Sequence, residues 1–428
     1  MKYKKSKYNI IIDRPEGRFL WNTCSNAFIK LDDEGVCWLE AFTGTPTADP
    51  YFKILLKNGC IVPEDLDETG KILYEEKATM LNTMPASMHF TISPGMGCNY
   101  NCHYCFEKGH GSGSIMSQET IHRTAEYIIE KMSANPNLKQ LSIRWFGGEP
   151  LLYMNAIENM SHVLMDWCAA NDIQYTAGIV TNGRYLTEEN ARKLKAVHIG
   201  YVQLSMDGVG KYYEEQKGAR EGDFEAVVEN LKTAADLLDI TVRINVTDRL
   251  DEALALTEFL LTDCGLDEKI KVYVAHVRDY EGMTAEKEQR SHAQFLELEG
   301  HYISLFGKDG PFSSKSLAFI LPKRRCTTCR TVCDTNFCIG PEGELYRCEH
   351  YFGRKEFSVG NVFSGRSYPE TELEYIKYRH LPKCLDCRLF PVCLGGCMND
   401  NTKGKPVLDC NAFLERQIDF LLRAYAPQ

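Results

Sequence analysis

The sequence predicts an α/β fold flanked by a small N-terminal α+β domain and a cysteine-rich C-terminal section. Three observations predict this organisation. Residues 7 to 31 form three short strand patterns, residues 88 to 276 alternate apolar strand patterns with amphipathic helical ones, and ten of the 18 cysteines lie between positions 326 and 410. A chain of 428 residues also exceeds what one hydrophobic core usually organises.

The N-terminal pattern predicts a three-stranded meander followed by helices. The strands are KYNIIID, RFLWNT and NAFIKLD, separated by turn-like stretches. Two helical patterns follow, EGVCWLEAF and PYFKILLKNG, and Gly59 ends the second one. We expect a small, winged-helix-like domain over residues 1–80.

The central section predicts six strand–helix units over residues 86–308. Its strands are MHFTIS, LSIRWF, QYTAGIV, GYVQLSM, ITVRINV and KIKVYVAH. Alternation of this kind favours a parallel sheet, either a partly closed barrel or an open doubly wound sheet. In a parallel barrel the chemistry gathers on loops at the carboxyl ends of strands.

The C-terminal section, residues 309–428, has little regular pattern before a final helix, NAFLERQIDFLLRAY. Because its apolar residues are few, we expect metal–ligand bonds to supply stability that packing does not.

Composition indicates a soluble, cytoplasmic protein. Hydrophobic residues make up 44% and charged residues 25% of the chain, and the net charge of -10 argues against a nucleic-acid partner. The N-terminal apolar run is too short for a secretion signal, and no stretch approaches the roughly 18 apolar residues of a membrane span. Because cytosolic thiols stay reduced, clustered cysteines indicate metal binding or redox work.

Three of the cysteines follow the first strand of the central section, in the stretch CNYNCHYC. Cys98, Cys102 and Cys105 have the spacing C-x3-C-x2-C. A [4Fe-4S] cluster takes one thiolate per iron, so three thiolates leave one iron open for a substrate or cofactor. Structural zinc is the competing interpretation, but it needs four ligands and His103 is poorly placed to be one.

This stretch, with Tyr104 before the last cysteine, resembles the signature of radical S-adenosylmethionine (SAM) enzymes. The resemblance implies a partial (β/α)6 barrel, similar to a TIM barrel, whose open iron is chelated by SAM and which produces a 5'-deoxyadenosyl radical. It extends to the motif GGEP and to LSMDG, and implies SAM contacts for Tyr104, Gly147, Gly148, Glu149, Pro150, Ser205 and, by an approximate match, Arg220. For the TNG motif at 181–183 and for Arg243, a turn or core position and a cofactor contact remain equal alternatives.

The C-terminal cysteines resemble the seven-cysteine ladder of a SPASM domain, which holds auxiliary [4Fe-4S] clusters. The resemblance implies an outer cluster on Cys384, Cys387, Cys393 and Cys410, and an inner cluster on Cys338, Cys348 and Cys397. For the fourth inner ligand we expect Cys333, with Cys329 as second choice and Cys326 also upstream. If none of these binds, the inner cluster has an open iron. The chain would then carry three [4Fe-4S] clusters.

Two further features bear on the reaction. Glu349 follows Cys348, and in sulfatase-maturing relatives an acidic residue there is the catalytic base, although an ordinary solvated glutamate is an equal alternative. The N-terminal domain, with LKNGCIVPEDLDE, resembles the leader-recognition element of ribosomal-peptide maturases, in which an edge strand captures the leader.

The resemblance as a whole implies a radical SAM/SPASM maturase of a ribosomally made precursor peptide (a RiPP), similar to sactipeptide and ranthipeptide synthases. It would form a thioether from a peptide cysteine, or, as the nearest variant, a carbon–carbon crosslink. Its partners would be the leader-bearing precursor and an electron donor such as flavodoxin or ferredoxin. The alternatives are an anaerobic sulfatase-maturing enzyme that forms formylglycine and a non-catalytic metal-binding protein.

Overall fold

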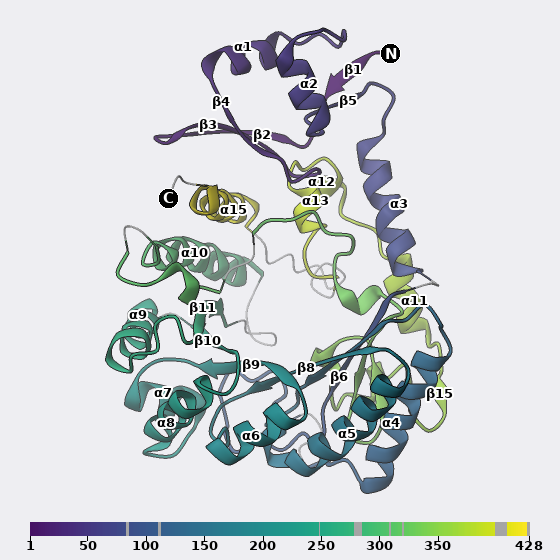
Figure 1. Cartoon of the computed structure of the whole chain (residues 1–428), viewed down its shortest axis with the longest axis vertical. Coiled ribbons are helices and arrows are strands. Elements are labelled where there is room, and N and C mark those ends of the chain that lie inside the picture. Colours follow the sequence, from purple (N-terminus) through teal and green to yellow (C-terminus); the bar gives the residue numbers. More distant parts are fainter. Residues whose placement is uncertain are drawn as a thin grey trace. The chain divides into compact units, whose positions relative to one another are not determined.

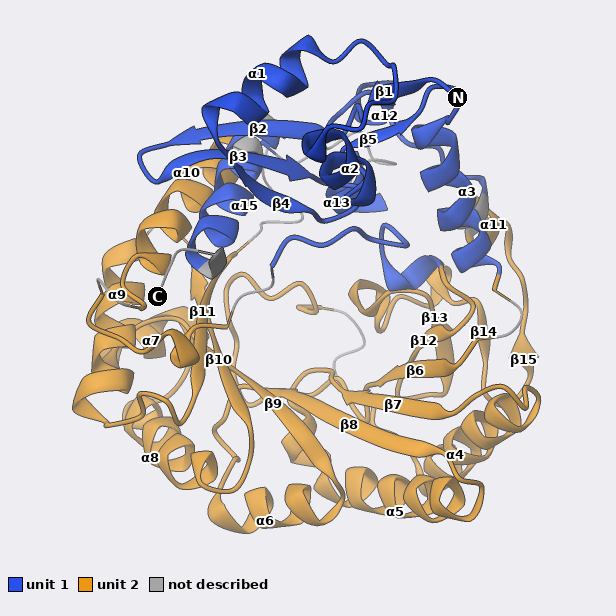
Figure 2. Ribbon diagram, turned by 45° about the horizontal axis from the view of Figure 1, so that its top comes forward, with its two compact units in different colours: residues 1–81, 320–332, 377–428 blue, residues 82–319, 333–376 orange. Residues whose placement is uncertain are grey.

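The computed structural model describes residues 1–82, 85–109, 113–247, 249–277, 285–307, 310–318, 321–398 and 409–425. The chain forms two compact units (Figures 1 and 2). Unit 1 consists of residues 1–81, 320–332 and 377–428, and unit 2 consists of residues 82–319 and 333–376. The C-terminal cysteines are therefore divided between the two units.

Unit 2 contains the predicted partial barrel. Its six parallel strands are β6 (Ser87–Ile92), β7 (Gln140–Trp145), β8 (Gln174–Thr181), β9 (Ile199–Met206), β10 (Ile240–Val246) and β11 (Lys271–His276). Its helices are α4 (Gln118–Ser133), α5 (Met154–Ala170), α6 (Glu188–Ala196), α7 (Gly210–Lys217), α8 (Asp223–Ala235), α9 (Leu250–Glu258) and α10 (Ala285–Ile303), with the short helices η1 (Pro150–Tyr153) and η2 (Phe259–Asp263). The strands follow chain order from β6 to β11, and Figure 2 shows helices on the outer side of the curved sheet. The α/β fold with a (β/α)6 sheet is confirmed.

Alternation along each strand separates the two faces of the sheet. On β9, Val202, Leu204 and Met206 are fully buried, whereas Tyr201 is exposed and Gln203 and Ser205 are half-buried. Successive side chains of a strand point to opposite faces, so one face holds the apolar core and the other carries polar groups. The apolar side chains face the helices, and the polar side chains face the inner, concave side of the curved sheet. A reaction site can therefore form on that inner side.

Four short strands extend this sheet beyond β6, and sequence reasoning missed them. They are β12 (Asn336–Ile339), β13 (Glu344–Tyr346), β14 (Gly360–Asn361) and β15 (Gly365–Arg366). Strand β12 runs parallel to β6 with Cys338 opposite Thr91, and β13 to β15 continue antiparallel. The remaining helices of this region are η5 (Glu349–Tyr351), η6 (Lys355–Phe357) and α11 (Glu370–Lys377). The ten-stranded sheet thus includes the first cysteines of the C-terminal ladder.

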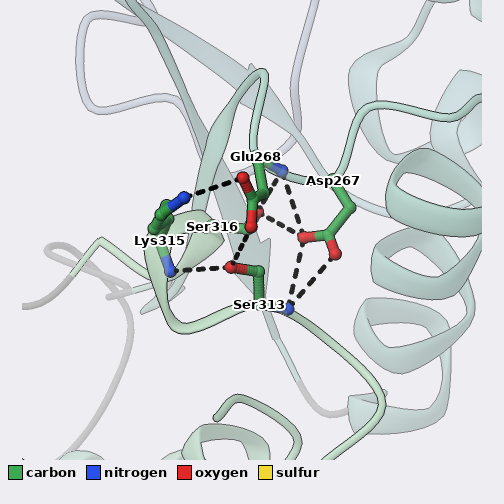
Figure 3. A network of polar contacts seen from close by, with 5 residues as sticks. All are labelled: Asp267, Glu268, Ser313, Lys315 and Ser316. Carbon is green, nitrogen blue, oxygen red and sulfur yellow. Dashed lines mark hydrogen bonds and ion pairs between the residues drawn. The ribbon is translucent and has the colours of Figure 1, made fainter.

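A polar network secures the chain beside the last barrel strand (Figure 3). Asp267 accepts bonds from the backbone N–H of Ser313 at 3.2 Å and from the hydroxyl of Ser316 at 2.5 Å. Glu268 pairs with Lys315 at 2.9 Å. The short helix η3 (Ser314–Ser316) is therefore held to the loop that leads into β11.

Unit 1 combines the N-terminal domain with C-terminal segments. Its N-terminal elements are β1 (Tyr3–Lys5), β2 (Asn9–Arg14), β3 (Gly17–Asn22), β4 (Phe28–Leu31), α1 (Asp33–Ala41), α2 (Pro50–Lys57), β5 (Ile61–Pro63) and α3 (Glu68–Met80). Its later elements are η4 (Arg330–Val332), α12 (Pro382–Leu385), α13 (Phe390–Cys393) and α15 (Cys410–Tyr425). The meander β2–β3–β4 and both helices were predicted, whereas the two-stranded β1–β5 ladder was not.

The meander is covered on both faces. On one face Leu20 packs with Val36, Leu39 and Phe52 of α1 and α2. On the other, Trp21 belongs to a buried cluster with residues of the C-terminal segments, which are Leu389, Val392, Ile418 and Leu421. Because Trp21 is fully buried between them, the N-terminal sheet and the C-terminal helices share one core.

Candidate functional site

The three-cysteine loop leaves the carboxyl end of β6. The structure exposes Cys98 and half-buries Cys102 and Cys105. The Cys98 sulfur accepts bonds from the backbone N–H of Tyr100 at 3.4 Å and from the Asn182 amide at 3.9 Å. Burial raises the pKa of the Cys98 thiol to about 12, and the hydrogen bond from Tyr100 acts against this shift by favouring the thiolate, the form that binds iron.

The GGEP turn, Gly147 to Pro150, packs directly on this loop. The backbone N–H of Glu149 donates to Gly97 O at 2.9 Å, and a Cβ at Gly148 would lie only 2.3 Å from the same oxygen. Gly147 has a φ of +113°, a region that side chains rarely adopt. Both glycines are therefore required for the turn to approach the loop so closely.

Glu149 connects this turn to the end of β8. Its carboxylate is fully buried and accepts bonds from the Thr181 hydroxyl at 2.7 Å and from the backbone N–H of Asn182 at 2.8 Å. Asn182 in turn donates to the Asn99 side chain at 2.9 Å. The TNG motif thus touches the cysteine loop, and the Glu149 carboxylate, whose pKa is raised by burial, is turned toward protein groups.

A buried polar network contacts the three-cysteine loop at the carboxyl ends of β9 and β10. The Lys217 ammonium lies 3.2 Å from Asp207 and donates to the Ser205 hydroxyl at 3.1 Å. Tyr104 donates its hydroxyl proton to Asp207, and Asn245 donates to both of these groups. Tyr104 and Ser205, two predicted SAM contacts, are therefore joined by the same ion pair.

Sequence reasoning missed Lys217. The stretch EEQKGAR resembles the exposed end of a helix closed by Gly218, yet the Lys217 side chain is only 3% exposed. Burial raises the pKa of the Cys102 thiol, and the Lys217 charge acts against this shift. No pattern in the sequence separates this lysine from its solvated neighbours.

The structure does not bring Arg220 to this group. Its side chain is exposed, and its backbone N–H donates to Asp223 at 3.0 Å. Asp223 also pairs with Arg184 at 2.6 Å. The assignment of Arg220 to SAM stays a prediction, and the cation that contacts Ser205 is Lys217.

Cys338 and Cys348, predicted ligands of the inner cluster, lie in unit 2. They share a buried cluster with Met96 of the three-cysteine loop and with Tyr346 and Phe352. The loop continues to Phe106, whose ring is 4.3 Å from that of His350. Cys333 is buried in the same unit, whereas Cys397 belongs to unit 1.

Glu349, the predicted base, pairs with Arg144 of β7 at 2.8 Å. Glu107, two residues after Cys105, lies near enough for its pKa to be raised to about 8, first by burial and then by the charge of Glu349. Neither Arg144 nor Glu107 was predicted. The carboxylate of Glu349 is therefore held by a cation on the strand that precedes the GGEP turn.

The four cysteines predicted to hold the outer cluster share one cavity of about 80 Å³ in unit 1. Cys384, Cys387, Cys393 and Cys410 all line it, together with apolar side chains that include Leu389 and Phe390. Burial raises the pKa of the Cys384, Cys393 and Cys410 thiols, and each of these thiols is influenced by another of the four. Four sulfurs around a small, mostly apolar cavity are the donor set that a [4Fe-4S] cluster requires.

Within the described ranges, no three His, Cys, Asp or Glu side chains converge as ligands of a single metal ion would. A [4Fe-4S] cluster binds one thiolate on each of four irons, so its sulfurs do not meet at one point. None of the described helices has the length and apolar character that a bilayer crossing requires.

A protein-family model matches the greater part of the barrel. The model of the Radical SAM superfamily matches residues 92–255, which include the three cysteines, the GGEP turn and Lys217. The chain is similar to the radical SAM cyclopropyl synthase TigE of Paramaledivibacter caminithermalis, with 35% identity over 122 residues, 26% of this chain and a quarter (25%) of that protein. It is also similar to the mycofactocin maturase MftC of Mycolicibacterium smegmatis, with 27% identity over 319 residues, 70% of this chain and 75% of that protein.

Among solved structures, the fold is similar to that of anSMEcpe with bound AdoMet. The TM-score is 0.57 at 18% identity, and the alignment covers 80% of this chain and 93% of that one. At this identity the likeness shows a shared fold alone.

Proposed function

The chain is a radical SAM enzyme, and from this premise we propose that it matures a ribosomally made precursor peptide by forming an intramolecular crosslink, a thioether from a peptide cysteine. A carbon–carbon crosslink is the nearest variant. A role as a non-catalytic metal-binding protein is set aside, because members of this superfamily are enzymes.

Enzymes of this class use SAM and a [4Fe-4S] cluster, which together supply a 5'-deoxyadenosyl radical that removes a hydrogen atom from the substrate. In this chain Cys98, Cys102 and Cys105 would hold the cluster. The chain's own contribution is a rigid loop: the GGEP turn packs on it from one side and the Lys217–Asp207 pair supports it from another. We propose SAM contacts for the predicted residues Tyr104, Gly147, Gly148, Glu149, Pro150, Ser205 and Arg220.

Two auxiliary clusters complete the proposal. The outer one would bind Cys384, Cys387, Cys393 and Cys410, and the cavity that these residues share supports it. The inner one would bind Cys338, Cys348 and Cys397, with Cys333 as the fourth ligand. The common buried cluster of Cys338, Cys348 and Met96 supports an inner site beside the three-cysteine loop.

The observation that carries the peptide assignment is the composition of unit 1. Its meander has two edge strands, β2 and β4, that pair with no further strand among the described residues. Edge strands of this kind bind extended peptides through backbone hydrogen bonds. The same meander packs on the outer cysteine segment through Trp21, Leu389 and Val392, so the edge strands proposed to bind the peptide and the proposed metal site belong to one unit.

We assign Glu349 as the base that removes a proton from the peptide. Its carboxylate is kept in position by Arg144, and its neighbour Cys348 is a proposed ligand of the inner cluster. A general base must reach the proton that it removes, so replacing Glu349 by Gln should lower crosslinking while SAM cleavage continues.

Mass spectrometry tests the proposal. The reconstituted protein would be incubated anaerobically with SAM, a reductant and short cysteine-containing peptides encoded near its gene, each with and without its leader. Loss of two hydrogens together with an alkylatable thiol, only when the leader is present, is the expected result. Cys102→Ala should abolish both this change and SAM cleavage, and Cys37→Ala, an exposed cysteine of the N-terminal domain, is the matched control.

An anaerobic sulfatase-maturing activity is the second candidate, favoured by the similarity of the chain to a cysteine-type anaerobic sulfatase-maturating enzyme, with 22% identity over 348 residues. It predicts oxidation of a single Ser or Cys to formylglycine in a sulfatase-derived peptide that has no leader. If this peptide reacts while the leader-bearing peptides stay unchanged, the crosslinking proposal fails.

A further inference from the structure

The segments of unit 1 around the outer cysteines are strongly basic. The described stretches 321–332 and 377–398 contain eight Lys and Arg residues, with Asp386 as their single acidic residue. Seven of the basic side chains are exposed, namely Lys323, Arg325, Arg330, Lys377, Arg379, Lys383 and Arg388. By contrast, residues 1–81 of the same unit contain 11 basic and 13 acidic residues, and the whole chain has a net charge of -10. The positive charge is therefore concentrated on these two stretches.

Two contacts tie this charge to the cysteine cavity. Lys383 lines the cavity itself, together with Cys384 and Cys410. The backbone N–H of Arg325 donates to Pro391 O at 2.9 Å, within α13, which carries Cys393. We call Arg325, Lys383 and Arg388, together with the other four exposed basic residues, the basic face.

The proposed crosslink needs an electron acceptor. Forming a thioether removes two hydrogens from the peptide: one leaves as a hydrogen atom in 5'-deoxyadenosine, and the other leaves as a proton and an electron. One electron is also required to cleave SAM reductively. A carrier can supply the electron that cleaves SAM and accept the electron that the peptide releases. The cycle is then balanced, because each turnover consumes no net electron.

We propose that the basic face is the docking surface of an acidic one-electron carrier protein of the flavodoxin or ferredoxin type. Complementary charge accelerates encounter and selects among partners, and the effect falls steeply with ionic strength. An exposed, predominantly basic surface on a chain of negative net charge suits an acidic carrier. The redox role of this partner rests on the proposed crosslinking, whereas its docking does not.

The test uses the cluster-loaded full chain and a bacterial flavodoxin as the probe. The patch variant is Lys323→Gln, Arg325→Gln and Arg388→Gln combined. The control is Lys53→Gln, Lys139→Gln and Lys195→Gln, three exposed lysines elsewhere, so both variants lose the same charge. Binding of oxidised flavodoxin is measured by calorimetry at low and moderate salt, with no peptide or SAM present. Electron transfer from reduced flavodoxin is followed by flavin absorbance.

We expect the patch variant to bind flavodoxin about tenfold more weakly or worse, with a flatter salt dependence, and the control to bind as the unmodified protein does. Iron content and dithionite-driven SAM cleavage should be equal in all three proteins. Unchanged binding by the patch variant overturns the proposal, as does an equal loss in the control. Weaker binding of an acidic leader peptide, with flavodoxin binding intact, would instead assign the face to the peptide. Intact docking with unmodified peptides would mean that the crosslinking proposal has failed and the docking surface has not.

Discussion

The ammonium group of Lys217 lies 3.2 Å from the Asp207 carboxylate, and both side chains are almost completely buried. Asp207 accepts further bonds from Tyr104 and Asn245, and the backbone carbonyl of Lys217 accepts a bond from Asn101 at 3.0 Å. The pair therefore connects the end of β9 to the three-cysteine loop through both side-chain and main-chain contacts.

Replacing Lys217 by Met should destabilise unit 2 by about 3–5 kcal/mol, because it leaves the Asp207 charge buried without its partner. Urea unfolding measures this loss. The double variant Lys217→Met/Asp207→Asn should recover part of it, since the unpaired charge is then gone. Lys195→Met, at an exposed position, should change the free energy of unfolding by less than about 0.5 kcal/mol. A loss at Lys217 as small as that of the control would show that the pair contributes little.

Gly148→Ala should prevent the GGEP turn from packing on the cysteine loop. The added Cβ would lie 2.3 Å from Gly97 O and 2.6 Å from Met96 O, and backbone atoms cannot move aside as a flexible side chain can. We expect SAM cleavage to be lost in an anaerobic assay for 5'-deoxyadenosine. Gly200→Ala is the matched control, because its Cβ would meet nothing closer than 3.9 Å. Equal activity of the two variants would contradict the close packing.

Loss of the outer cysteines should loosen the N-terminal sheet. Cys384→Ala combined with Cys410→Ala should lower the iron content by about four per chain, since one cluster is lost. Because Ile10 and Trp21 share a core with Leu389 and Val392, protease cleavage within residues 1–81 should also accelerate. Mass spectrometry of the fragments locates the cleavage. Protection as complete as in Cys37→Ala would mean that the shared core holds without the cluster.

Glu76 should make unit 1 sensitive to acid. Burial acts to raise the pKa of its carboxyl, but hydrogen bonds from His380 at 2.6 Å and Thr328 at 2.6 Å prevail and lower it. A lowered folded-state pKa stabilises the fold above the unfolded value, about 4.3, and this contribution disappears as pH falls through the folded value. The difference in unfolding free energy between the unmodified protein and Glu76→Gln should therefore be constant near neutral pH and shrink below about pH 4.3. A difference that persists in acid would exclude the ionised carboxylate as its source.

The barrel was predictable from the sequence because its signals are local. Each strand is an apolar run followed by an amphipathic helix, and the motifs that contain Cys98, Gly148 and Ser205 lie at or just after the carboxyl ends of strands. The carboxyl ends of parallel strands meet at one edge, so residues far apart in the chain were expected together. The four cysteines of the outer cavity were predictable for a different reason, since their spacing resembles a known ladder.

The features that were not predicted depend on contacts between residues that are far apart in the sequence. Strands β1 and β5 have three residues each, too few to show an alternating pattern. Strand β12 pairs with β6 about 250 residues earlier, and no periodicity announces such a partner. Lys217 was missed because burial of a charge depends on where Asp207 ends up, and local sequence does not contain that information.

The pairing of β12 with β6 fixes Cys338 opposite Thr91. The proposed inner site is thereby spaced from the three-cysteine loop by a set number of steps along one hydrogen-bonded ladder. Electron tunnelling between the proposed inner cluster and the cluster proposed on the three-cysteine loop would depend steeply on the distance between them. The register of β12 against β6 helps to set that distance. An insertion or deletion of one residue between Thr335 and Cys338 would therefore change the rate of electron transfer between the two proposed clusters, even if every cysteine ligand were kept.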